Sequence, residues 1–186
     1  MALINNIIPV QNFELIRDRI AEIAALELAN QKTLINSSDP VNVFKESLSN
    51  FNHAEVLRVN VMYDGSGDVD EHQAGSMNQS RYFIDVYAAG KAGAAISGGE
   101  DSSTRLHRCL GRLRYIFSNT AYRTLGFNPG VIGSVNVNSI QIAGLDRNDD
   151  TSNITMGRFS LHVNHNETQA LETGVQMQEA LTAVKL

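Results

Sequence analysis

The sequence predicts a single α+β domain in which helices pack on one face of a mostly antiparallel four-stranded sheet. Four segments alternate between apolar and polar residues, as strands with one buried face do. Three other segments repeat apolar residues at spacings of three and four, as amphipathic helices do. The predicted order is helix, helix, strand, strand, helix, strand, strand, which is typical of helices that cover one side of an antiparallel sheet.

Length and composition agree with one domain. The chain has 186 residues, of which 42% are hydrophobic and 19% charged, and this is enough apolar material for a core. We expect a single domain over residues 1–186 with its core at about 12–165. Residues 1–11 could form an N-terminal arm, and residues 166–186 could form a weak helix or a C-terminal arm.

Three helices are predicted from apolar spacing. The first spans residues 12–32, and the third spans about 101–120 before the sequence LGFNPG ends it. The second is shorter and begins at Asp39, with Pro40 in the first helical position that proline favours. The apolar residues that define the three helices are Phe13, Ile16, Ile20 and Ile23; Val41, Phe44, Leu48 and Phe51; and Leu106, Leu110, Leu113 and Phe117.

The four predicted strands lie in EVLRVNVMY, RYFIDVYAAG, SVNVNSIQIAG and MGRFSLHVN. We expect the first two to form one hairpin, joined by the polar segment 64–80. In the second strand the alternation places Asp85 on the face opposite the core row. We therefore interpret Asp85 as a residue of the non-core face and not as a catalytic acid. The core row of that strand is Tyr82, Ile84, Val86 and Ala88.

Signatures of catalysis and of metal or cofactor binding are missing, so we expect no catalytic residue, no metal and no cofactor. The nucleophile motif Gly-x-Ser-x-Gly is absent, and GAAISGGED lacks the Lys-Ser/Thr of a phosphate loop. His162 and His165 are three apart on a predicted strand, so they should point to opposite faces. Cys109 lies near the apolar edge of the third helix, where a structural thiol is expected.

Charge and hydropathy limit the partners. The net charge of −5 disfavours nucleic-acid binding, for which basic proteins are typical. No apolar run approaches the ~20 residues that span a bilayer, so no membrane partner is expected. The single cysteine fits synthesis in a reducing, intracellular compartment.

Two charged stripes and one acidic segment are candidate subunit contacts. An arginine stripe on the third helix and an acidic stripe on the first would meet between copies in a head-to-tail ring. The alternative is that both stripes are simply solvated. The segment 64–80 contains four acidic residues and no lysine or arginine, and it either docks onto an adjacent ring or stays a solvated tip. The candidate interface residues are Arg105, Arg108, Arg112, Glu14, Asp18, Glu22, Asp68, Asp70 and Glu71.

Over residues 12–165, the order of these elements and their pattern of polar and apolar residues resemble those of the tail terminator and tail-completion (neck) proteins of tailed bacteriophages. The resemblance rests on a leading helix, VLRVNVMY, a long polar insertion, RYFIDVYAAG, the helix LHRCLGRLRYIF, LGFNPG and a final strand MGRFSLHV. It implies a structural protein that forms a hexameric ring, caps the finished tail tube and stops further subunit addition.

The same resemblance implies the partners and the location. The ring would contact the tail tube protein and the head connector proteins, and DNA would pass through its lumen without specific binding. No reaction and no cofactor are implied. The protein would assemble in the host cytoplasm and remain in the virion, in the tail or neck.

Three alternatives stay open at this point. The chain could be another head–tail adaptor subunit of the virion. A small-molecule-binding α+β module could use Phe83, Asp85 and Tyr87 on the sheet. A hydrolase could use Cys109 or a serine, and it would need a base held in place by the fold.

Overall fold

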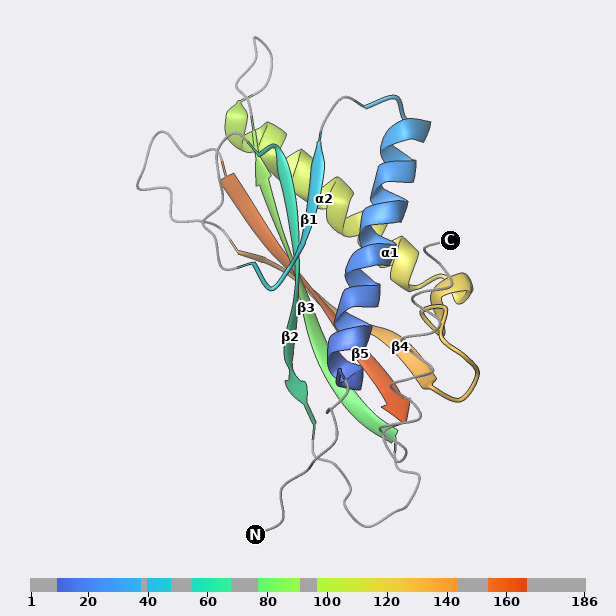
Figure 1. The fold of residues 1–186 in the computed structure, drawn as a ribbon. Helices are drawn as coiled ribbons and strands as arrows, with labels where there is room; N and C mark the ends of the chain where they lie inside the picture. The colour runs from blue at the N-terminus through green and yellow to red at the C-terminus, as the bar shows by residue number, and fades with distance from the viewer. Residues whose placement is uncertain are drawn as a thin grey trace.

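The computed structural model describes residues 10–37, 40–47, 55–67, 77–90, 97–143 and 154–166 (Figure 1). Apart from residues 10, 11 and 166, the two predicted arms lie outside this part of the chain. The elements are α1 (Asn12–Leu34), β1 (Val41–Lys45), β2 (Leu57–Ser66), β3 (Met77–Ala89), α2 (Gly98–Phe117), the 3-10 turn η1 (Thr120–Tyr122), β4 (Ile132–Ala143) and β5 (Ile154–Asn166).

The strands form one mixed sheet in the order β1-β2-β3-β5-β4. β2 pairs with β3, β3 with β5 and β5 with β4, all antiparallel, whereas β1 pairs with β2 in parallel. The α+β class is therefore confirmed, and so is the pairing of β2 with β3. The sheet is mostly antiparallel as predicted, but the predicted number of four strands is wrong, because a fifth, parallel strand extends one edge.

The fifth strand replaces the start of the second predicted helix. Residues Val41–Lys45 pair in register with β2, and Val43 lies opposite Val59. Val41 and Val43 pack against the core, and pairing with β2 makes this segment a strand. β-branched valines suit a pleated strand better than a helix. The other residues of the predicted stripe, Leu48 and Phe51, lie outside the described residues.

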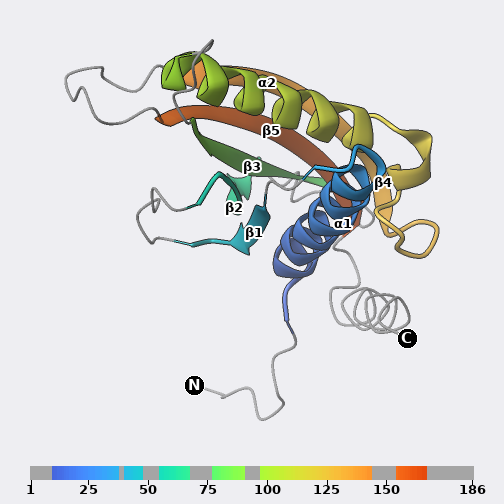
Figure 2. The same cartoon turned by 90° about the horizontal axis from the view of Figure 1, so that it is seen from above.

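Both helices cover the same face of the sheet. α1 packs on β1 and β2, while α2 packs on β3, β5 and β4, as Figure 2 shows from above. Tyr82 and Ile84 of the predicted core row are fully buried beneath them, which confirms the alternation. The same core contains Ile16, Ile20, Val59, Val61, Val86, Ala88, Leu106, Leu113, Phe159, Leu161 and Val163.

Two glycines set how closely α2 approaches the sheet. A Cβ placed on Gly157 of β5 would lie 2.7 Å from Cδ1 of Leu110. A Cβ placed on Gly90, just after β3, would lie 1.8 Å from the carbonyl oxygen of Gly98. The first turn of α2 thus rests directly on the end of β3, and Ser97 caps it by accepting a hydrogen bond from the N–H of Glu100 (3.2 Å).

Candidate assembly surfaces

The sheet face opposite the helices is held together by an ion pair around Asp85. This carboxylate is only 2% exposed, and Arg158 donates to both of its oxygens at 2.7 and 2.8 Å. Arg158 also stacks over the ring of Phe83 at 4.2 Å. The hydrogen bonds to Asp85 raise the pKa of Arg158 despite its partial burial. Asp85 lies on the non-core face as predicted, yet its neighbours bury it.

A second arginine cluster ties the edge strand β1 to β2. Arg58 lies over the ring of Phe44 at 4.6 Å and donates to the hydroxyl of Ser47. Asn60 accepts from the N–H of Ser47 at 2.9 Å and donates to its carbonyl at 3.1 Å. These contacts stabilise the parallel edge whose helix prediction was wrong.

The predicted acidic stripe on α1 has partners within the chain. Asp18 forms ion pairs with Arg17 and with Lys45, each at 2.8 Å, and so joins α1 to β1. Glu22 pairs with Arg19 at 2.9 Å, and Arg19 also donates to the carbonyl of Leu125 at 2.8 Å. These contacts engage two of the three acidic residues. A role for them between copies stays a prediction.

Glu14, the third member of that stripe, lies half-buried in the first turn of α1. Of the predicted loop residues, Asp68, Asp70 and Glu71 lie outside the described residues. Asp64 precedes them at the end of β2 and forms an ion pair with Arg81 of β3.

The arginine stripe on α2 divides into one paired and two unpaired residues. Arg105 pairs with Asp101 one turn earlier at 2.9 Å. Arg108 and Arg112 form no ion pair with the residues that the structure describes. They line a hollow of about 360 Å³ between α1 and α2, next to Tyr115, which is 75% exposed. The other residues that line this hollow are Glu27, Gln31, Gly111, Ile116, Asn119 and Tyr122.

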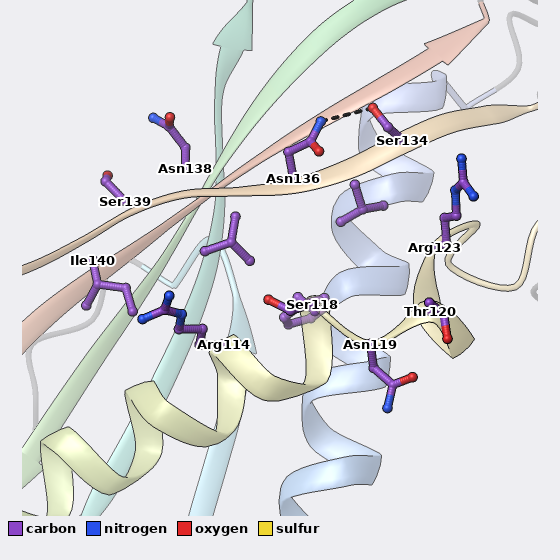
Figure 3. A pocket seen from close by; sticks show the side chains of 13 residues that line it. Arg114, Ser118, Asn119, Thr120, Arg123, Ser134, Asn136, Asn138, Ser139 and Ile140 are labelled. Atoms are coloured by element: carbon purple, nitrogen blue, oxygen red, sulfur yellow. Dashed lines mark hydrogen bonds between the residues drawn. The ribbon is translucent and has the colours of Figure 1, made fainter.

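A larger hollow of about 750 Å³ lies on the other side of α2, between its C-terminal end and the edge strand β4 (Figure 3). Arg114 extends from α2 toward Ile140 of β4, and Arg123 stands beside η1 at the other end. Neither arginine forms an ion pair with a described residue. The remaining lining residues are Phe117, Ser118, Asn119, Thr120, Ser134, Val135, Asn136, Val137, Asn138 and Ser139.

The two hollows meet at Asn119, which lines both. Together they carry four arginines, which we call the arginine surface: Arg108, Arg112, Arg114 and Arg123. Sequence reasoning found the first two and missed Arg114 and Arg123. The signal that would have found them is the run 102–145, which holds five arginines and no acidic residue in a chain of net charge −5.

The thiol of Cys109 faces the core. It is 1% exposed, and burial raises its pKa to about 12 although Arg112 lowers it slightly. A thiol in this setting is protonated at neutral pH and shielded from reagents. His162 and His165 lie on opposite faces of β5, as predicted, and His165 is hydrogen-bonded to Ser80 at 2.8 Å. Among the described residues, no group of three or more His, Cys, Asp or Glu side chains is placed to hold a metal ion.

Neither described helix is at once long enough and apolar enough to span a lipid bilayer. Comparison with protein-family models gives no match for this chain, and a search of curated proteins finds no significant similarity.

Proposed function

We propose that this chain is a structural protein of a bacteriophage virion, a tail terminator that forms a hexameric ring. The ring caps the tail tube and joins it to the head connector. The observation that carries the proposal is the arginine surface, whose four guanidinium groups have no carboxylate partner among the described residues. On a chain of net charge −5, such a surface complements an acidic protein surface and favours association with it.

The interior supports an assembly role over a catalytic one. The buried ionisable groups at the centre of the sheet and beneath α1 are engaged in structural pairs, Asp85 with Arg158 and Arg19 with Glu22. Cys109 is buried and protonated. These groups stabilise the subunit, whereas the four arginines without an ion pair to a described residue line hollows on its surface.

The sheet face opposite the helices is compatible with DNA passing through a ring. Its arginines Arg58, Arg81 and Arg158 pair with carboxylates of the same chain. An arginine that already has a carboxylate partner neutralises phosphates less readily, and each neutralised phosphate adds a contact that retains DNA. Such a face lets DNA slide past it.

The proposal is tested by adding the purified protein to growing tail tubes of the same phage. We expect tubes of restricted length with additional ring density at one end in electron micrographs. The double variant Arg108→Glu, Arg112→Glu tests whether the arginine surface is needed for this effect. Both side chains lie on the surface of α2, so the variant should stay folded. We expect this variant to leave tube growth unrestricted. Tubes that grow equally long with and without the wild-type protein would contradict the proposed function.

A further inference from the structure

We infer that the arginine surface is the docking site for an acidic segment of a second copy, residues 64–71. The inference rests on the proposed function and deepens it, since it names the contact by which subunits join. It is supported by the shape of the surface, the lack of ion pairs at its arginines within the described residues, a glycine on α2 and the distribution of acidic residues in the sequence.

The arginine surface is one continuous region around the exposed side of α2. Arg108 and Arg112 line the hollow toward α1, whereas Arg114 lines the hollow toward β4. Tyr115 lines the hollow toward α1, with 75% of its surface exposed. Because both hollows share Asn119, a single extended segment can contact arginines on both sides of the helix end.

The arginines of this surface differ from the others that the structure describes. Six arginines form ion pairs with carboxylates of their own chain: Arg17, Arg19, Arg58, Arg81, Arg105 and Arg158. The four arginines of the surface form none within the described residues. A planar guanidinium is suited to bind a carboxylate through two parallel hydrogen bonds. Carboxylates that lie outside the described residues are therefore the ligands that this surface fits.

A glycine in the middle of α2 adds to the case for close contact. Gly111 lies between Arg108 and Arg112 on the exposed side, and a Cβ placed there would meet no atom within 4 Å. Glycine is a poor helix former, and no neighbour among the described residues requires it here. The missing side chain leaves the helix backbone open to close approach by a partner.

The acidic segment 64–71 has the complementary charge. Between Arg58 and Arg81 the sequence holds four acidic residues and no lysine or arginine, and all four fall within residues 64–71. Asp64 pairs with Arg81 of its own chain. We assign the contact to the other three acidic residues, Asp68, Asp70 and Glu71. The segment begins within the last residues of β2, while the arginine surface is built by α2, η1 and β4 (Figure 1). Two different patches that bind each other give a head-to-tail contact, which closes into a ring at a suitable rotation.

The first test uses a fluorescent peptide with the sequence of residues 64–76 as the probe for the full-length protein. We expect saturable binding in fluorescence anisotropy, weakened at least tenfold in the variant Arg114→Glu, Arg123→Glu. Arg81→Gln, on the opposite face of the sheet and 53% exposed, is the matched control and should bind as the wild type does. A peptide with Asp68→Asn, Asp70→Asn and Glu71→Gln should not bind. Absence of binding to the wild type, or equal loss in the Arg81 variant, would overturn the inference.

The second test distinguishes contact between copies from contact within one chain. One protein carries Arg114→Glu and Arg123→Glu, and another carries Asp68→Asn, Asp70→Asn and Glu71→Gln. Each should be monomeric alone, whereas a one-to-one mixture should form a dimer and nothing larger, because one intact contact remains. Only monomers in the mixture, at concentrations where the wild type assembles, would overturn the inference. If the peptide binds and the mixture dimerises but tail tubes are not capped, the docking stands and the proposed function fails.

Discussion

Replacing Gly90 by alanine is expected to destabilise the protein by about 3 kcal/mol, the upper part of the range for overpacking a close contact. The new Cβ would lie 1.8 Å from the carbonyl oxygen of Gly98 and 2.6 Å from the backbone nitrogen of Ser102. Both are backbone atoms of α2, so no side chain can rotate away. The first turn of α2 would have to move off the end of β3. Part of the core that α2 covers would then be exposed.

The measurement is the free energy of unfolding from urea titration, with thermal unfolding as a second readout. For a chain of this size, a loss of about 3 kcal/mol lowers the midpoint temperature by roughly 10 °C. Gly99→Ala is the matched control, since a Cβ on Gly99 would meet no atom within 4 Å. Equal stability of the Gly90 and Gly99 variants would show that α2 does not rest on β3 in this way.

Replacing Arg158 by leucine is expected to cost about 3 kcal/mol, because it leaves the carboxylate of Asp85 buried without its partner. Breaking a buried ion pair from one side typically costs about 3–5 kcal/mol. We expect the lower end of that range, since the Arg158 side chain is 36% exposed and water can enter where it was. Loss of the stacking on Phe83 adds to the effect.

A double-mutant cycle with Asp85→Leu isolates the pair. We expect Asp85→Leu with Arg158→Leu to be more stable than Arg158→Leu alone, because the unpaired buried charge is gone. Arg81→Leu removes an exposed pair with Asp64 and should cost only about 0–1 kcal/mol. If Arg158→Leu and Arg81→Leu were equally stable, the burial of Asp85 would not matter to the fold.

Much of the fold followed from local pattern. Alternation located four strands, and the period of three and four located α1 and α2 to within a few residues. The helix prediction failed at Val41–Lys45. These five residues fit the period of a helix and that of a strand, and only pairing with β2 decides between the two structures. The face of Asp85 was predictable from its own strand. Its burial was not, because Arg158 is 73 residues away in the sequence.

The arginine surface was predictable only in part. Helical spacing joined Arg108 to Arg112, since both project from one side of a helix. Arg114 projects toward β4, and Arg123 follows η1, so their place in one surface depends on how β4 packs beside α2. The absence of acidic residues over 102–145 is a sequence signal for the whole arginine surface. It does not predict how the four arginines are arranged in space.

We propose that this chain assembles into a closed ring of six copies. Native mass spectrometry over a range of protein concentrations tests this proposal most directly. We predict a species of six copies that grows with concentration and is present on capped tail tubes. Its formation should weaken with added salt, because charged contacts between subunits are screened. A chain that remains a monomer or a dimer at every concentration, and also when bound to tail tubes, would contradict the claim.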